Sequence, residues 1–358
     1  MTDAAQTTEA DVTVGIPGYE VDAVEAWVSE RVPALVAPYT WTQLEGGHSN
    51  LTYRIDGADG EKSAVIRRPP LGELLPKAHD MGREWRCISA IYGRGVPVAE
   101  PLAFCEGPEV TGAHFYVMGL IEGMAMYGVE DVESWIPEDK RVIAAESWID
   151  VLATLHSLDI DEIGLGDLGK REDYVLRQAK TWYRSFTSSV EAAEIDDQRI
   201  HDLYETLIAK MPGQGPATLV HGDYGTHNVM FGRDSTVAAV VDWEIATLGD
   251  PLADLGYSLN AWAQPDDPFL DNDEATSLAP GFPTRDHLRD RYAAKTGRDL
   301  SDLPYYLAFN RFKTACIVHG VYARYKRGQK EIDADELTEM HERVERLIDA
   351  ADDAGRDI

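Results

Sequence analysis

The sequence has 358 residues, which is long for one compact core, and its 44% hydrophobic content is typical of a globular protein with two lobes. A formal charge of -30 at pH 7 argues against nucleic-acid partners and against anionic membrane surfaces. The chain has no run of about 18 apolar residues and no signal-peptide pattern, so we expect a cytoplasmic protein without a membrane partner.

The N-terminal part of the chain is rich in predicted strands. Residues 1–16 are small, polar and acidic, which predicts a flexible tail, and apolar residues at helical spacing predict a helix within 21–36. A second helix is expected at 79–92. Strands are expected within 41–55, 63–70, 96–106 and 113–121. The pattern therefore predicts a β-rich N-lobe over 17–119 with one inserted helix, followed by a hinge at 120–125.

The rest of the chain changes to a helical period. Helices are expected within 144–158, 174–186, 200–211, 285–297, 305–328 and 334–355. Between them, NVMFGRDSTVAAVVDWE predicts a β-hairpin with a GRDS turn. We therefore expect a larger, mainly helical C-lobe over 126–358 and an α+β fold overall.

The stretch HGDYGTHN at 221–228 is the strongest candidate for chemistry. His221, Asp223 and His227 are candidate zinc ligands, but the glycines between them oppose the helical spacing that is common in such sites. A polar turn is a second interpretation. The spacing His-x-Asp-x-x-x-x-Asn also matches the catalytic loop of protein kinases, which a metal-binding Asp on a hairpin follows. The predicted hairpin supplies such a residue in Asp242, which favours the kinase interpretation.

Phosphoryl transfer explains why these residue types occur together. A carboxylate beside the acceptor hydroxyl orients it and takes its proton, and Asp223 suits this role. Magnesium prefers hard oxygen ligands, which the amide of Asn228 and the carboxylate of Asp242 would supply. Glu244 is either an assisting acid on the same side or a solvated loop residue.

HGDYGTHN, followed by VVDWEIATLGDPLADLGY, resembles the aminoglycoside phosphotransferase family, which includes choline kinases. The segments GGHSNLTYRI, VIRRPP, HDMGREWR and FYVMGLIEG most resemble the branch related to the kinase-like domain of acyl-CoA dehydrogenase family members ten and eleven. The resemblance covers roughly residues 20–330. It implies a bilobal protein-kinase-like fold and an ATP- and Mg²⁺-dependent phosphotransferase that acts on a hydroxyl of a small molecule.

The resemblance also implies roles for residues of the C-lobe. Asp223 matches the catalytic base of the family, and Asn228 and Asp242 match its two magnesium ligands. Structural support is implied for the remaining matched positions, which are His221, Asp250 and Asp254. Local physics agrees for Asp250, because an Asp before Pro251 is a favoured helix N-cap.

In the N-lobe the resemblance implies a nucleotide site. Its residues are Gly46, Gly47 and Ser49 over the ATP phosphates, Gly119 and Ile121 at the adenine, and Arg67 with Glu84 as its helix partner. Most kinases carry a lysine where this chain has Arg67, and the arginine fork is bulkier than lysine. Arg67 and Arg68 together would offset the acidic background of the protein near ATP.

Two features of the C-lobe predict different phosphate acceptors. Acids of the 266–274 loop would suit a polycationic aminoglycoside, whereas the basic residues of 311–327 would suit an anionic acceptor such as a coenzyme-A thioester. Each set could also be ordinary surface. Because of Arg67, a nucleotide-binding pseudokinase or scaffold without transferase activity is an alternative to an enzyme.

Overall fold

The computed structural model describes residues 15–44, 50–72, 80–267, 275–329 and 332–358. These residues form two compact units, the first within 15–89 and 99–120, the second within 90–98 and 121–358. Of the expected tail over 1–16, residues 1–14 lie outside the described part. The lobe boundaries and the hinge at 120–125 stay predictions.

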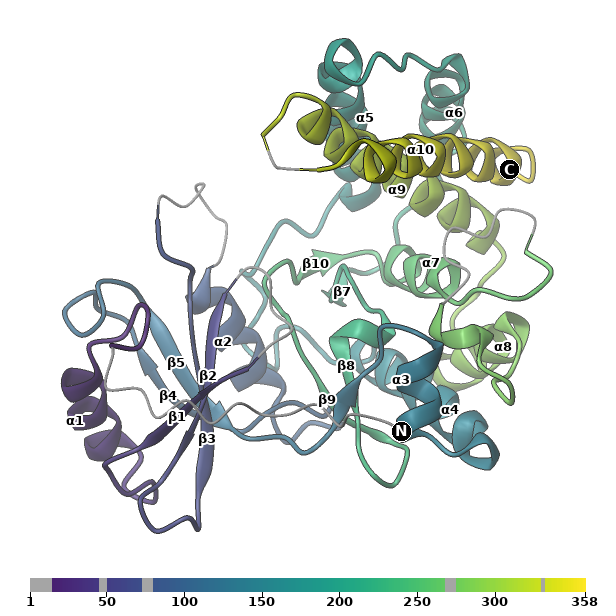
Figure 1. Cartoon of the computed structure of the whole chain (residues 1–358). Helices are drawn as coiled ribbons and strands as arrows, with labels where there is room; N and C mark the ends of the chain where they lie inside the picture. Colours follow the sequence, from purple (N-terminus) through teal and green to yellow (C-terminus); the bar gives the residue numbers. More distant parts are fainter. Residues whose placement is uncertain (1–14, 45–49, 73–79, 268–274, 330–331) are drawn as a thin grey trace, which may run out of the picture. The chain divides into compact units, whose positions relative to one another are not determined.

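The first unit is built on one antiparallel sheet of five strands in the order β1-β2-β3-β5-β4 (Figure 1). The strands are β1 (Thr40–Gln43), β2 (Leu51–Asp56), β3 (Ser63–Arg68), β4 (Pro101–Cys105) and β5 (Phe115–Gly119). Two helices accompany them, α1 (Val21–Arg31) and α2 (Met81–Ile91). The predicted strands and the inserted helix are therefore present.

Alternation along the strands assigns each helix to its own face of the sheet. Ile66 and Phe115 belong to a core that also holds Val24 and Val28 of α1. Their neighbours along β3 and β5 point to the other face, where Trp85 of α2 stacks on Phe104 with ring centroids 5.7 Å apart. Arg67, one residue after Ile66, therefore lies on the α2 face.

Two elements of this unit are shorter than their predicted ranges. The opening helix ends at Arg31 because Pro33 follows, and a proline disfavours helical geometry in the residue before it. The strand expected within 96–106 is limited to β4, which begins at Pro101.

The second unit is mainly helical (Figure 1). Its helices are α3 (Val129–Trp135), α4 (Arg141–Leu155), α5 (Tyr174–Ala193), α6 (Gln198–Ala209), α7 (Pro251–Ala261), α8 (Arg285–Thr296), α9 (Leu303–Lys326) and α10 (Ala334–Gly355). Its strands are β6 (Met124–Ala125), β7 (Thr218–Val220), β8 (Val229–Phe231), β9 (Val237–Val240) and β10 (Thr247–Gly249). The α+β prediction is confirmed, and β8 and β9 form the expected hairpin. No helix in the described ranges has the length and apolar character needed to cross a membrane.

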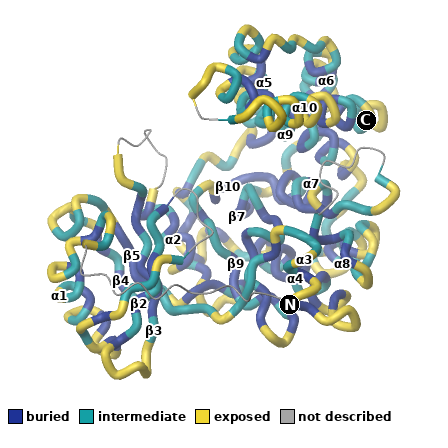
Figure 2. Tube along the Cα trace, viewed as in Figure 1, coloured by how far each residue is buried: buried dark blue, intermediate teal, exposed yellow. Residues whose placement is uncertain are grey.

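Helix α9 is the central element of this unit. It packs against α5, α7 and α10, and Figure 2 shows that α10 is largely exposed on its outer side. The contact with α7 is close because Gly256 faces α9 without a side chain, and Asn310 donates to the Ala253 carbonyl at 2.8 Å. The approach of these two helices matters because both contribute to the candidate site.

Replacing Gly256 by alanine should lower the stability of the protein. A Cβ there would lie 3.0 Å from both Asn310 Nδ2 and the Tyr306 carbonyl oxygen. Overpacking of this kind costs about 1–3 kcal/mol. Alanine recovers up to about 1 kcal/mol of helix propensity, so we expect a net loss near 1 kcal/mol in urea unfolding. Gly213→Ala is the matched control, because nothing lies within 4 Å of that position; equal effects of the two would contradict the packing argument.

Candidate functional site

The 221–228 loop lies between β7 and β8. It ends in a short 3-10 turn, Thr226–Asn228. Gly222 has a φ of +87°, and an added Cβ would lie 3.2 Å from Ile245, so glycine is required on two grounds. This turn lets His221 point into the core while Asp223 faces the other way.

His221 is a scaffold residue in this loop. It is fully buried, its Nε2 lies 3.0 Å from the Val241 carbonyl oxygen, and its Nδ1 accepts from the Asp223 N–H at 3.3 Å. Its ring also packs edge-on against Trp243 at a centroid distance of 4.9 Å. Both ring nitrogens are therefore engaged by the protein, which rules out the zinc interpretation for His221.

Asp254 of helix α7 holds the 221–228 loop in position. The buried carboxylate accepts the N–H of His221 at 2.7 Å and that of Gly222 at 2.8 Å, and lies 3.2 Å from His156 Nε2. Burial would raise the pKa of Asp254, but the hydrogen bonds from His156 and from the loop hold it below its ordinary value. Asp250 caps α7 as predicted, since its side chain accepts the Leu252 N–H at 3.0 Å.

Both carboxylate oxygens of Asp223 have partners. The hydroxyl of Tyr257, on α7, donates to Oδ1. Oδ2 accepts from Asn228 Nδ2 at 2.9 Å and lies 3.4 Å from His227 Nε2. Burial would raise the pKa of Asp223, but the His227 and Tyr257 hydrogen bonds outweigh it and hold the pKa well below its usual range. Asp223 is therefore an ionised acceptor that can orient a hydroxyl group.

Asn228 and Asp242 come close through the β8–β9 hairpin. The Val241 N–H donates to the Asn228 carbonyl at 3.0 Å, which brings Asp242, the residue after Val241, close to Asn228. Nδ2 of Asn228 is used on Asp223, at the carboxylate and at the main-chain oxygen, 3.0 Å away. Its amide oxygen therefore points away from Asp223, the orientation that a metal ligand needs.

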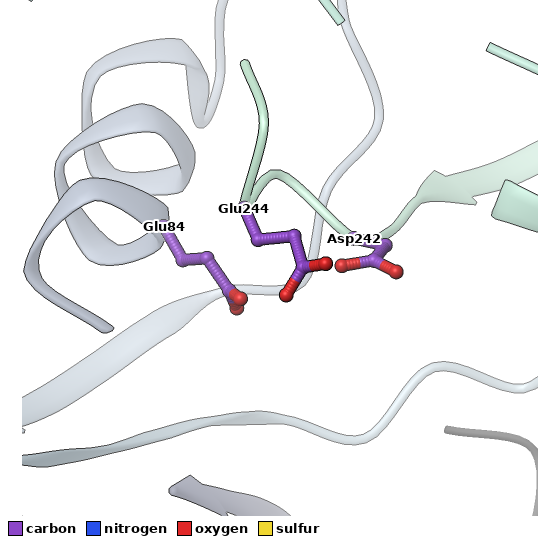
Figure 3. Close-up of side chains that lie close together, drawn as sticks. All are labelled: Glu84, Asp242 and Glu244. Atoms are coloured by element: carbon purple, nitrogen blue, oxygen red, sulfur yellow. The ribbon is translucent and has the colours of Figure 1, made fainter. Parts of the chain in front are cut away.

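Asp242 and Glu244 present neighbouring carboxylates on the loop that follows β9 (Figure 3). Their closest ligand atoms lie within 4.8 Å of each other. Asp242 has a φ of 62°, a left-handed conformation that non-glycine residues adopt rarely and mostly where function requires it. This set of hard oxygen atoms fits Mg²⁺.

In the first unit, Arg67 pairs with Glu84 of α2. Arg67 Nε lies 3.3 Å from Glu84 Oε2, and the hydroxyl of Tyr116, the partner of Arg67 across β3 and β5, donates to the same oxygen at 2.7 Å. Figure 3 shows Glu84 projecting from α2. The structure thus places the arginine and the helix glutamate together, as predicted.

Arg68 does not join Arg67, which corrects the expectation of a paired cationic site. Adjacent strand residues point to opposite faces, so Arg68 turns to the α1 side. It is buried there and donates to the main-chain oxygens of Gly18, Pro69 and Thr111. Arg68 is therefore a structural residue, and of these two arginines it is Arg67 that lies on the α2 face.

The other predicted nucleotide residues are placed only in part. Gly46, Gly47 and Ser49 lie outside the described residues. Gly119 ends β5, and its N–H already donates to the Glu100 carbonyl at 2.8 Å, so that group is not free for adenine. Ile121 follows two residues later and begins the longer segment of the second unit.

A cavity of about 380 Å³ opens beside the loop within the second unit. Its walls include His227 and Tyr257 beside Asp223, the aromatic rings of Trp148 and Trp262, and two arginines, Arg311 and Arg343. Of the predicted 311–327 basic residues, Arg311 reaches this cavity, whereas Lys326 pairs with Glu194 at 2.9 Å. The fifteen-residue separation puts them about 22 Å apart on α9, so the predicted basic set does not form one patch.

Tyr257 is an aromatic residue that could wall a pocket and Lys313 belongs to the basic set of 311–327, but the sequence does not predict that both contact this loop. Lys313, on α9, donates to the Gly222 carbonyl at 3.4 Å and lies 5.2 Å from the centroid of the Tyr257 ring. Tyr257 follows Asp254 by three residues, so the helical period places both on one face of α7. That spacing was a usable signal, whereas nothing near Lys313 in the sequence indicates the contact.

Comparison with known proteins supports the resemblance seen in the sequence. The family model of the phosphotransferase enzyme family matches residues 40–290. The chain is 36% identical to acyl-CoA dehydrogenase family member 10 of Mus musculus and 31% identical to member 11 of Homo sapiens. These matches cover 88% and 90% of this chain but 29% and 42% of the relatives, so the chain spans less than half of their length.

Solved structures show the same fold. A Ralstonia eutropha protein provisionally described as an aminoglycoside phosphotransferase has a TM-score of 0.79 and 28% identity, covering 95% of this chain and 99% of that one. Spectinomycin phosphotransferase in complex with ADP and spectinomycin has a TM-score of 0.61 and 14% identity, covering 94% and 98%. The kinase-like fold that the resemblance implied is confirmed.

Proposed function

We propose, because the chain belongs to the phosphotransferase enzyme family, that it transfers the γ-phosphate of ATP to a hydroxyl group of a small metabolite. The observation that carries the proposal is the environment of Asp223. Its carboxylate is ionised and is fixed by Tyr257 and Asn228, and Tyr257 lines a cavity large enough for a metabolite. An alcohol that enters this cavity would donate its hydroxyl hydrogen to Asp223.

The residues divide the chemistry among them. Asp223 would orient the acceptor hydroxyl and accept its proton as the oxygen attacks phosphorus. Asn228 and Asp242 would hold Mg²⁺, which neutralises the charge of the phosphates when it is bound. Arg67, oriented by Glu84, would bind phosphate oxygens of the nucleotide. Gly46, Gly47 and Ser49 would cover those phosphates, and the backbone near Ile121 would bind the adenine.

The charges of the cavity favour an acceptor that carries an anionic group. Asp267, an acid of the loop expected to bind aminoglycosides, pairs with Arg285 at 2.6 Å. Arg311 forms no ion pair with any described residue, and burial and then the charge of Arg285 lower its pKa. A partly buried cation of this kind is stabilised by an anion. A hydroxylated acyl-coenzyme A thioester or another anionic hydroxy compound fits better than an aminoglycoside.

A metabolite screen tests this function directly. The purified protein is incubated with ATP and Mg²⁺ and with hydroxylated compounds of both charge classes, and products are identified by mass spectrometry. We expect phosphorylated products from anionic hydroxy compounds with the wild type and none with Asp223→Asn. Failure of every compound, together with no rise in melting temperature on adding millimolar Mg-ATP, would contradict the proposal.

Replacing Arg67 by methionine should weaken Mg-ATP binding. Methionine removes the charged donor but keeps an unbranched side chain between the sheet and α2. A hydrogen bond to a charged group is worth about 1.5–3 kcal/mol, so the dissociation constant should rise roughly 10- to 100-fold. Arg67→Lys should recover part of the loss. Arg31→Met, at an exposed arginine on α1, is the control for calorimetric titration; equal affinities of the Arg67→Met variant and the wild type would exclude Arg67 from the nucleotide site.

A further inference from the structure

The hydroxyl of Tyr257 lies at the carboxylate of Asp223 in the second unit. It donates to Oδ1 of Asp223, which is the bond that an acceptor hydroxyl would make, and its ring lines the cavity. Burial, and then the negative charge of Asp223, raise the pKa of Tyr257 far above its ordinary value. The phenol therefore stays protonated and donates its hydrogen to the carboxylate.

The phenol is held there by contacts on its other side. The ammonium of Lys313 lies 5.2 Å from the ring centroid and also donates to the Gly222 carbonyl, one residue before Asp223. No carboxylate among the described residues lies within 4.0 Å of this ammonium. The position of Lys313 is fixed in turn, because Asn310 of the same helix binds the Ala253 carbonyl of α7. The Tyr257 ring, the Lys313 ammonium and the loop at Gly222 therefore hold one another in position.

We propose that Tyr257 takes the place of the acceptor hydroxyl at Asp223 and thereby keeps water from it, so that ATP is not hydrolysed before an acceptor binds. The inference rests on the proposed phosphotransferase function. In this role Tyr257 determines whether a metabolite or water receives the phosphoryl group.

The reaction that Tyr257 suppresses is ordinary hydrolysis. A water oxygen would form a bond to the γ-phosphorus of ATP while the bond to the β–γ bridging oxygen breaks. ADP leaves with that electron pair, and the water proton passes to Asp223 and then to solvent. Water would have to replace a charge-assisted hydrogen bond already made inside the protein, and a single water molecule has few further contacts to offset that loss. A metabolite can displace the phenol because its remaining contacts with the cavity supply the binding energy.

The test needs no knowledge of the acceptor. Tyr257→Phe keeps the ring in the cavity wall and removes only the hydroxyl, so water can reach Oδ1 of Asp223. ATP hydrolysis with Mg²⁺ and no added acceptor should rise at least about 10-fold above wild type, the ratio that corresponds to losing one charged hydrogen bond. Lys313→Met, which loosens the ring, should give a smaller rise, and Lys313→Arg should restore the low rate.

Controls separate this inference from the proposed function. Tyr183→Phe removes a different hydroxyl of the second unit, one that contacts His201, and should leave hydrolysis unchanged. If Mg-ATP raises the melting temperature of wild type and Tyr257→Phe alike but hydrolysis by the variant is no faster, the inference is overturned while the function stands. If neither protein responds to Mg-ATP, the proposed function fails and the inference fails with it.

Discussion

Replacing Asp223 by asparagine should lower the rate of phosphoryl transfer by about 10²–10⁴-fold while the protein stays folded. Asparagine has nearly the same shape but carries no charge and cannot take the proton of the acceptor hydroxyl. One carboxylate oxygen is also replaced by an N–H₂ group, which cannot accept the hydrogen bond that Tyr257 or Asn228 donates at that position. The loss should therefore appear in kcat, measured by coupled detection of ADP, more than in KM for ATP.

The matched control is Asp266→Asn, an exposed acid of the second unit, which should keep wild-type kinetics. Melting temperatures of both variants distinguish loss of chemistry from loss of fold. Since Asp223 lies at the surface of the loop and His221 and Asp254 hold the backbone, we expect little change in melting temperature. Turnover by Asp223→Asn equal to that of wild type would remove Asp223 from the reaction.

Much of the fold follows from local patterns in the sequence. A few neighbouring residues specify three features that the structure has. These are the end of β3 before Pro69 and Pro70, the β8–β9 hairpin and the N-cap at Asp250. The very short strands β7 and β10 were not predicted separately, because three residues carry too little periodicity. Their pairing depends on residues about thirty positions apart.

For the candidate site, too, local sequence patterns predict some residues and not others. Asp223, Asn228 and Asp242 could be selected because the loop and the hairpin bring them together locally. Tyr257 and Lys313 reach the loop from α7 and α9, so their roles depend on how those helices pack. Arg68 shows the converse error, since two adjacent arginines look like one cationic site until strand alternation sends them to opposite faces.

Replacing Asp254 by alanine should lower the free energy of unfolding by about 3–5 kcal/mol, the usual cost of removing one partner from a buried charged network. The carboxylate is almost fully buried and accepts from two consecutive backbone N–H groups. Without it, those donors and His156 lose their partner inside the core. Urea unfolding measures the loss, and the exposed control Asp266→Ala should change stability by less than about 0.5 kcal/mol.

The same carboxylate predicts how the difference depends on pH. The pKa of Asp254 is lower in the folded protein than its ordinary value of about 3.9, so its contribution is complete well above that value and fades as the pH falls through it. The stability gap between wild type and Asp254→Ala should therefore be constant from about pH 7 to pH 5 and shrink below that. A gap that stays the same down to about pH 3 would mean that the charge of Asp254 does not stabilise the loop, and that its packing alone accounts for the loss.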